Sequence, residues 1–140
     1  MNRDGTLFDQ QHLADERLTW MLNPRVPLLT IECRGGVTDN DLIERIPAIW
    51  QQHEDIHRYD VLVDLRRLTN EGGWTWAGLK KLSCEWNAYA KGKPINKRIT
   101  ILTEDKLIVL LVKLLAHLFE GGRYRCFTDT GPALDWIARK

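Results

Sequence analysis

The sequence predicts an α/β fold with a mixed, mostly parallel sheet, and three observations lead to this expectation. Short apolar runs alternate with amphipathic segments in the order ββαβαβαβα. Helices between successive strands imply crossover connections and therefore parallel pairing. The first two strands, in contrast, are separated only by the turn signal Asn23, Pro24 and Arg25, so they form an antiparallel hairpin at the start of the sheet.

The hairpin and the first helix follow from local patterns. Residues 17–22 and 28–33 read as the two strands, and the apolar residues of the first alternate on one side. Thr38 and Asp41 form a variant of the capping box that begins the helix. One face of this helix then carries Leu42, Ile43, Ile46, Ile49, Trp50 and His53.

The later elements alternate regularly between strand and helix. An apolar run at Val61–Val63, with Leu65 beyond it, is typical of a strand covered on both faces. The elements expected after it are a helix at Trp74–Ala90, a strand at 99–102, a helix at Lys106–Glu120 capped by Asp105, a strand at Tyr124–Thr128 and a final helix that Asp129 or Thr130 caps, with Pro132 near its start.

Composition places the chain among ordinary globular proteins. Its 140 residues fit one domain, at residues 16–140, preceded by a polar lead-in at residues 1–15. The net charge of +1 creates no broad positive potential that would attract nucleic acid. The longest apolar run is too short to span a bilayer. Three widely spaced cysteines and no signal peptide predict reduced thiols and a cytoplasmic location.

Two segments resemble the STAS superfamily, in particular the SpoIIAA-like proteins related to bacterial anti-sigma-factor antagonists. They are VLVDLRRLT at Val61–Thr69 and CFTDTGPALDWIA at Cys126–Ala138, and the order of elements extends the similarity over residues 16–140. The resemblance implies a protein-interaction switch, and some structurally similar domains bind lipids or other small molecules.

The phosphorylated serine of the best-understood switches has no counterpart here. The resemblance places it between the strand in Val61–Thr69 and the next helix, where this chain reads NEGGWTW at residues 70–76. Thr69 and Thr75 are the hydroxyl groups that remain as candidate phosphoacceptors. We therefore do not predict that this chain is regulated by phosphorylation.

The same loop is a candidate ligand or partner site. Gly72 and Gly73 precede a helix at the carboxyl end of a parallel strand, where α/β sheets place their sites and backbone N–H groups can meet an anion. The simpler interpretation is that the glycines only make a turn. Trp74 and Trp76 complete this candidate site. Trp76 shares the expected sheet-facing side of the helix, whereas Trp74 lies at the mouth and is the better anchor for a ligand or partner.

His53, Glu54 and His57 match the H-E-x-x-H pattern of zinc hydrolases. That chemistry needs one helix running through both histidines and a third metal ligand. Strand signals begin by Val61 and no third ligand is evident, so we predict neither a metal nor a cofactor, and no catalytic residue.

The helix at 106–120 is the most informative segment. Its polar residues form one narrow stripe, and the apolar remainder is wider than a surface helix needs. Either neighbouring helices bury the excess or it is an interface, for which a homodimer is the simplest use. The candidate interface residues are Leu107, Ile108, Leu111, Leu115 and Leu118.

These features predict a non-enzymatic interaction or regulatory module of the STAS type, acting as a homodimer or on a protein partner. The alternative is a carrier or sensor of a lipid-like, apolar small molecule. A metal-dependent hydrolase is a remote third interpretation.

Overall fold

A six-stranded sheet in the order β1-β2-β3-β4-β5-β6 forms the centre of the molecule. The computed structural model describes residues 7–8, 17–69, 73–119 and 121–139. The strands are β1 (Leu7–Phe8), β2 (Leu18–Asn23), β3 (Leu28–Gly35), β4 (Asp60–Leu68), β5 (Lys97–Leu102) and β6 (Gly122–Phe127). The helices are α1 (Asp39–Trp50), α2 (Trp76–Ala90), α3 (Lys106–Leu115) and α4 (Thr130–Ala138), with short 3₁₀ turns η2 (Ile56–Arg58) and η3 (Ala116–Leu118).

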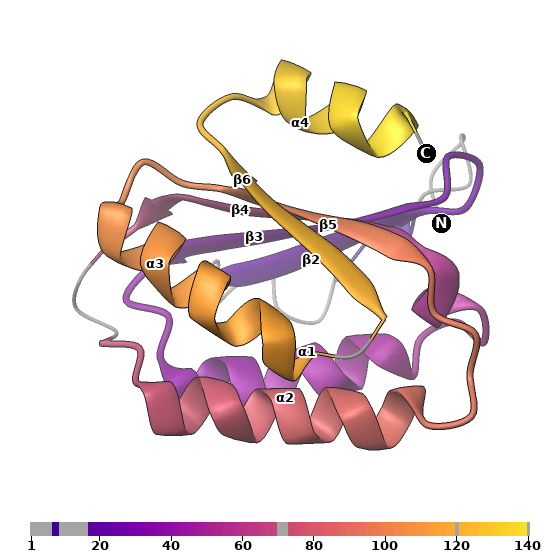
Figure 1. The fold of residues 1–140 in the computed structure, drawn as a ribbon, viewed down its shortest axis with the longest axis horizontal. Coiled ribbons are helices and arrows are strands. Elements are labelled where there is room, and N and C mark those ends of the chain that lie inside the picture. Colours follow the sequence, from indigo (N-terminus) through magenta and orange to yellow (C-terminus); the bar gives the residue numbers. More distant parts are fainter. Residues whose placement is uncertain (1–6, 9–16, 70–72, 120, 140) are drawn as a thin grey trace.

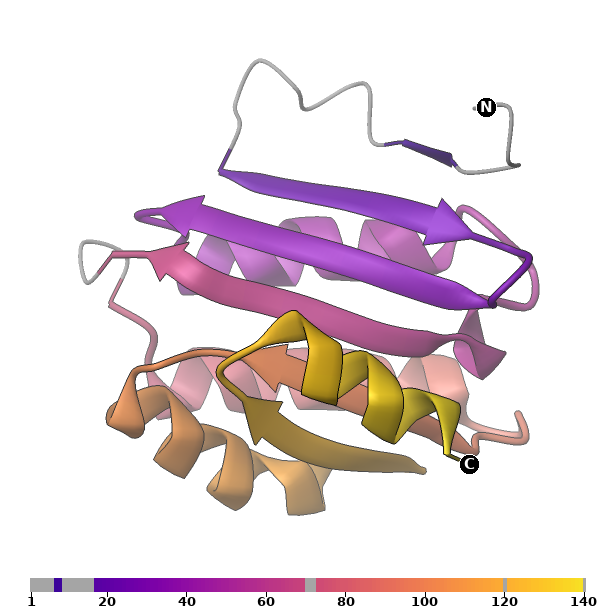
Figure 2. The same ribbon diagram turned by 90° about the horizontal axis from the view of Figure 1, so that it is seen from above.

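The helices are divided unequally between the two faces of the sheet. Figures 1 and 2 show α1, α2 and α3 on one face and α4 on the other. Strands β3 to β6 pair in parallel through these crossovers, while β2 and β3 form the antiparallel hairpin. The predicted α/β class and the mixed sheet with its leading hairpin are therefore confirmed. Strand β1, which pairs antiparallel with β2, was not predicted and lies within the expected lead-in.

Local capping explains where the helices begin. Thr38 and Asp41 form the predicted capping box of α1, and the Asp105 carboxylate accepts a hydrogen bond from the backbone N–H of Leu107 at the start of α3. Helix α2 begins at Trp76 rather than at Trp74, because Thr75 is its N-cap.

The third helix is shorter than predicted. Regular α3 ends at Leu115, and η3 continues the chain to Leu118 in tighter 3₁₀ turns. Glu120, the predicted end of this helix, lies outside the described residues. The last strand, β6, covers Gly122–Phe127 instead of the predicted Tyr124–Thr128.

Apolar side chains are buried on both faces of the sheet. The main core lies between the sheet and helices α1 to α3, where Leu18, Leu22 and Val37 are fully buried. A smaller cluster lies between α4 and the sheet and is formed by Ala133 of α4 with Leu62 and Leu102 of the sheet. Over the part of the chain that the structure describes, no helix has both the length and the apolar character required to cross a membrane.

Candidate functional site

An apolar cavity of about 190 Å³ lies within the main core, between the sheet and helices α1, α2 and α3. Protein interiors are close-packed and rarely leave voids larger than a water molecule, so a space of this size is a candidate binding site. We call it the chamber. Its walls come from all of these elements and include Ile31, Val63 and Ile101 of the sheet, Leu42 and Ile46 of α1, Leu79, Leu82 and Trp86 of α2, and Ile108, Leu111, Val112 and Leu115 of α3.

The chamber extends along the strands. Val61 and Leu65 of β4 both line it, and at about 3.3 Å per residue they are about 13 Å apart. Trp74, which follows the carboxyl end of β4, lines it as well, and Lys97 lines it at the start of the parallel neighbour β5. The two residues therefore mark opposite ends of the chamber.

The chamber wall carries little polarity. Among its described lining residues, Lys97 alone is charged. Tyr124 is the phenol in the wall, and burial raises its pKa, so it is neutral. Such a surface binds water poorly and suits an apolar ligand.

The loop end of the chamber is held by hydrogen bonds between α1 and α2. The carboxylate of Asp39, at the first position of α1, accepts from the Thr75 backbone N–H at 2.9 Å and from the Thr75 hydroxyl at 2.5 Å. The Thr75 hydroxyl oxygen in turn accepts from the Gly78 backbone N–H at 3.1 Å. The Trp74 indole N–H donates to the Val37 carbonyl at 2.7 Å, which orients the ring into the chamber wall.

Gly78 allows these two helix ends to meet. A Cβ atom at this position would lie 2.4 Å from Cγ of Asp39, far inside van der Waals contact. The bonds between Asp39 and Thr75 therefore depend on the absence of a side chain at Gly78, in the first turn of α2. We call this contact the α1–α2 junction.

The residues predicted to bind a ligand or partner at the loop differ in their burial. Gly72 lies outside the described residues, and Gly73 has a φ of 60°, the left-handed conformation that favours glycine. Trp74 is half-buried in the chamber wall, whereas Trp76 is 45% exposed. The expectation that Trp76 faces the sheet is wrong, because it is the first residue of α2 and lies beyond the rim of the core.

The two candidate phosphoacceptors, Thr69 and Thr75, differ in how their hydroxyl groups are engaged. Thr69 is exposed, and its backbone N–H donates to the Gly35 carbonyl. The Thr75 hydroxyl already serves as the N-cap of α2 and as a donor to Asp39. A phosphate on Thr75 would have to displace that carboxylate, because like charges repel at this distance.

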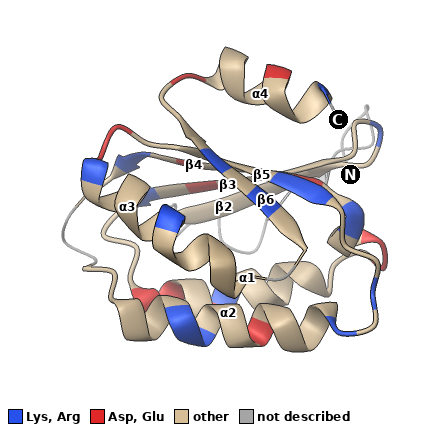
Figure 3. Cartoon of the chain, viewed as in Figure 1, with Lys and Arg blue, Asp and Glu red and all other residues tan. Residues whose placement is uncertain are grey.

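Helix α3 divides its apolar residues between the core and the surface. Among the predicted interface residues, Ile108, Leu111, Leu115 and Leu118 pack against the main core and only Leu107 is strongly exposed, at 71%. Leu110 and Leu114 are the other exposed apolar residues of this helix, at 53% and 51%. We call Leu107, Leu110 and Leu114 the leucine patch. Figure 3 shows α3 as mostly uncharged, consistent with Lys106 and Lys113 being its charged residues.

The H-E-x-x-H segment lacks the geometry of a zinc site. Helix α1 ends at Trp50, so no helix runs through His53 and His57. His53 Nδ1 accepts a hydrogen bond from the Asp55 backbone N–H, and its ring lies against Tyr59 with the centroids 5.4 Å apart. His57 is buried in η2. Within the described ranges, no three His, Cys, Asp or Glu side chains are grouped to hold a metal ion.

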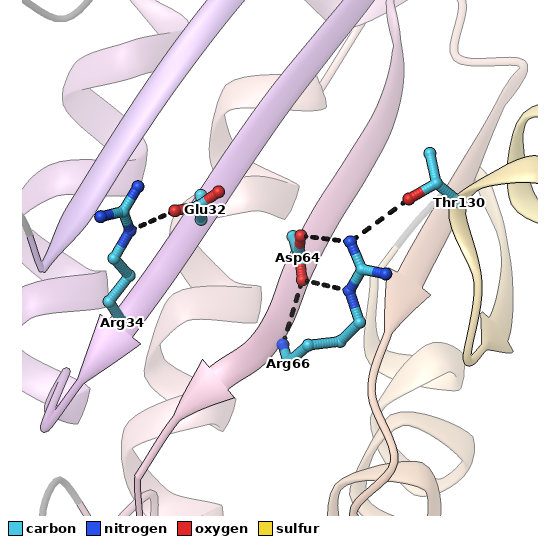
Figure 4. A network of polar contacts seen from close by, with 5 residues as sticks. All are labelled: Glu32, Arg34, Asp64, Arg66 and Thr130. Atoms are coloured by element: carbon cyan, nitrogen blue, oxygen red, sulfur yellow. Dashed lines mark hydrogen bonds and ion pairs between the residues drawn. The ribbon is translucent and has the colours of Figure 1, made fainter.

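Polar side chains gather on the opposite face of the sheet, below α4. Figure 4 shows the Arg66 guanidinium pairing with both oxygens of Asp64, at 2.9 and 3.0 Å, and donating to the Thr130 hydroxyl at 3.2 Å. The hydrogen bonds from Arg66 hold the pKa of Asp64 below its ordinary value. Arg34 and Glu32, both on β3, form a second pair. The contacts of Arg66 tie β4 to the start of α4, and both pairs lie away from the chamber.

Sequence reasoning missed several residues of the site. Lys97 was not among the predicted site residues, although it lies two residues before Ile99 and four before Ile101, on the same face of the strand, which indicates an inward side chain. Leu110 and Leu114 adjoin the polar stripe of α3, which is the signal that they are exposed. Nothing in the local sequence identifies Asp39 as the partner of Thr75, because the two residues meet only through tertiary packing.

Comparison with known proteins finds the same fold. The model of the family described as SpoIIAA-like matches residues 28–138. An uncharacterized protein of the DUF3478 family with a SpoIIAA-like fold, from Shewanella loihica PV-4, is similar in structure with a TM-score of 0.56 and 18% sequence identity. The alignment covers 98% of this chain and 97% of that one. No curated protein gives a significant match.

Proposed function

The chain belongs to the SpoIIAA-like family, and from that premise we propose that it is a non-enzymatic binding module of the STAS type whose ligand is an apolar small molecule. Family membership fits a regulatory module but leaves its ligand open. The observation that carries the proposal is the chamber, an apolar space of about 190 Å³ between the sheet and helices α1, α2 and α3.

Physical chemistry favours an apolar occupant over water. A water molecule needs two to four polar partners, and the aliphatic walls of the chamber supply few. A ligand that covers those walls gains about 25 cal/mol for each Å² of apolar surface removed from water. Pockets that are mostly apolar with a few polar groups are typical of small-molecule sites.

The groups that a covalent mechanism would need are not activated near the chamber. Burial raises the pKa of the Cys33 thiol to about 12, so this residue is not a thiolate nucleophile at neutral pH. Tyr124 is likewise neutral. These features support binding as the activity of the site.

The test uses native mass spectrometry on freshly purified, untagged protein, followed by titration with decanol. We expect a co-purifying apolar molecule or saturable decanol binding. Replacing Leu111, which lines the chamber, by Trp should fill the space and abolish binding. The matched control is Leu110→Trp on the same helix, where the side chain is 53% exposed and binding should persist. Equal binding by both variants would place the ligand elsewhere.

A second candidate function is protein association through the leucine patch. Leu107, Leu110 and Leu114 lie one or two turns apart on the same side of α3 and are each more than half exposed. Exposed apolar residues grouped in this way mark interaction surfaces. A two-fold homodimer is the simplest arrangement, because it requires only one self-complementary surface.

Oligomeric state measured by light scattering at tens of micromolar tests this candidate. We expect the native chain to be dimeric and Leu110→Glu to be monomeric, because a buried carboxylate without a partner is costly. Val26→Glu is the control, since Val26 is 60% exposed in the hairpin turn, far from α3. A native chain that is monomeric at these concentrations would contradict self-association.

A further inference from the structure

We infer that the open edge of β6 binds an extended, acidic segment of a partner protein, which joins the sheet as an additional strand. The inference goes beyond the proposed function, because it concerns a protein partner at the rim of the sheet and not the ligand of the chamber. It rests on two features of β6, its unpaired backbone groups and its two exposed arginines.

Strand β6 is paired on one side only. It is the last strand in the order of the sheet, and Figure 2 shows it at the margin opposite the hairpin of β2 and β3. Apart from its ladder with β5, its backbone bonds to the Thr103 N–H, which donates to the Phe127 carbonyl at 2.9 Å, and to no other described group. Such an edge is a template for a further strand.

The alternation of the backbone identifies the groups at the open edge. The bond from Thr103 lies on the side of β5, so the N–H and C=O of Phe127 point toward β5. Alternate residues of a strand direct these groups to the same side, which places the backbone groups of Arg123 and Arg125 toward β5 as well. The residues whose N–H and C=O groups point away from β5 are Gly122, Tyr124 and Cys126.

The side chains of Arg123 and Arg125 lie along this edge on the face that carries α4. They alternate with Tyr124 and Cys126, which pack against the main core, and they are about 6.6 Å apart along the strand. Both are exposed. Arg125 lies against the ring of Phe127, at 5.2 Å from its centroid, and neither arginine has an acidic partner among the described residues.

Positive charge also borders the other face of this edge. Burial raises the pKa of the Cys126 thiol, and the Lys113 ammonium of α3 opposes that shift, so the ammonium lies near the core-facing side of β6. Lys113 is exposed. Figure 3 shows Lys and Arg, but no Asp or Glu, along β6 and α3. A strand added here meets positive charge on both faces of the sheet.

This charge selects the occupant of the edge. Side chains directly opposite one another on adjacent strands interact in pairs, so acidic residues two apart would lie across from Arg123 and Arg125. A second copy of β6 is disfavoured, because antiparallel pairing about a two-fold axis would set arginines against arginines. A nucleic acid would match the charge but could not continue the backbone ladder. An acidic stretch of polypeptide satisfies both the backbone and the charge.

The experiment titrates the full chain with an acetylated and amidated hexapeptide of alternating Glu and Thr. Amide hydrogen exchange, followed by NMR, reports the contact. We expect the N–H groups of Tyr124 and Cys126 to gain protection, whereas those of Arg123 and Arg125, which already face β5, should change little. A peptide of alternating Lys and Thr should not bind. The acidic peptide methylated at every backbone nitrogen should not bind either, because it keeps its charge but cannot form the ladder.

Substitutions test the contribution of the arginines. Arg123→Gln and Arg125→Gln should each weaken binding of the acidic peptide about two- to fivefold. Arg25→Gln is the matched control and should leave affinity unchanged, because Arg25 is exposed in the turn between β2 and β3, at the other side of the sheet. Leu111→Trp, which fills the chamber, should bind the peptide as the native chain does, so this inference and the proposed function can fail separately.

Several outcomes would overturn the inference. They are failure of the acidic peptide to bind at millimolar concentration, equal binding of the basic or the methylated peptide, and tighter binding of a hexathymidylate than of the acidic peptide. The comparison of these compounds on the native chain decides the question even if an arginine variant does not fold.

Discussion

His57 shows how a single buried polar residue can make stability depend on pH. It is 7% exposed, and no described residue forms a hydrogen bond with its Nδ1. Burial, assisted by the nearby positive charge of Arg58, lowers the pKa of His57 below its ordinary value. The folded chain therefore holds this imidazole neutral.

The sign of the effect on stability follows from linkage. The unfolded chain binds the proton at higher pH than the folded chain does, so the free energy of unfolding falls as pH drops below the unfolded value of about 6.5. Each unit by which folding lowers the pKa contributes about 1.4 kcal/mol to this loss. We expect urea denaturation from about pH 8 to about pH 5 to show the decrease.

Replacing His57 by Gln should flatten this dependence, because the new side chain does not titrate. His117 is exposed in η3, and His117→Gln should keep the slope of the native chain. If the free energy of unfolding of His57→Gln still fell with pH as steeply as that of the native chain, other groups would be responsible for the pH dependence.

Residues whose role is local were the easiest to predict. Thr38 and Asp105 cap helices within three residues of themselves, so their pattern in the sequence is sufficient. The inward position of Lys97 and the bond between Asp39 and Thr75 depend on neighbours that are distant in the chain. Local patterns carry no information about those neighbours.

At the scale of elements, the α1–α2 junction joins two helix beginnings through one carboxylate. Replacing Gly78 by Ala would improve helix propensity by about 1 kcal/mol but force a Cβ into Asp39. Overpacking of this kind costs about 1–3 kcal/mol. Because displacement of Asp39 also breaks its bonds to Thr75, we expect Gly78→Ala to lower the free energy of unfolding by about 1–2 kcal/mol, as measured by urea denaturation.

Gly131 supplies the control for this substitution. It also lies in the first turn of a helix, α4, but a Cβ there meets nothing within 4 Å. Gly131→Ala should therefore be neutral or stabilising. If the two alanine variants had the same effect on stability, close approach of Asp39 to α2 would not be what constrains Gly78.

The sequence was sufficient to predict which segments are helices and which are strands. It was less informative about where each element ends and about which of its side chains are buried or exposed. The apolar excess of α3 was visible in the sequence, and the structure resolves it into a core-facing side and the leucine patch. The extent of regular helix was overestimated because the periodic pattern continues through η3, where the backbone tightens to 3₁₀ geometry. Periodicity does not distinguish these two helix types.

At the scale of the whole molecule, the order of strands and helices determines the layers, but it does not determine how completely they fill the space between them. Crossover connections place α1, α2 and α3 against one face of the sheet, as expected from the alternation of elements. The chamber depends on the volumes of side chains contributed by all of these elements. No single segment of the sequence reveals that their sum leaves a cavity.

The sign of a stability change tests whether that cavity is available to a ligand. Ala116 lines the chamber at the start of η3, and Ala116→Leu would add three carbon atoms to it. Burial is worth about 0.8 kcal/mol per methylene group, so we expect the free energy of unfolding to rise by about 1–2 kcal/mol while decanol binding is lost. Ala133 of α4 is fully buried against the face of the sheet away from the chamber, and Ala133→Leu should lower the free energy of unfolding by about 1–3 kcal/mol through overpacking. If Ala116→Leu were as destabilising as Ala133→Leu, the space beside α3 would be too small for a ligand, and binding would have to occur at the surface.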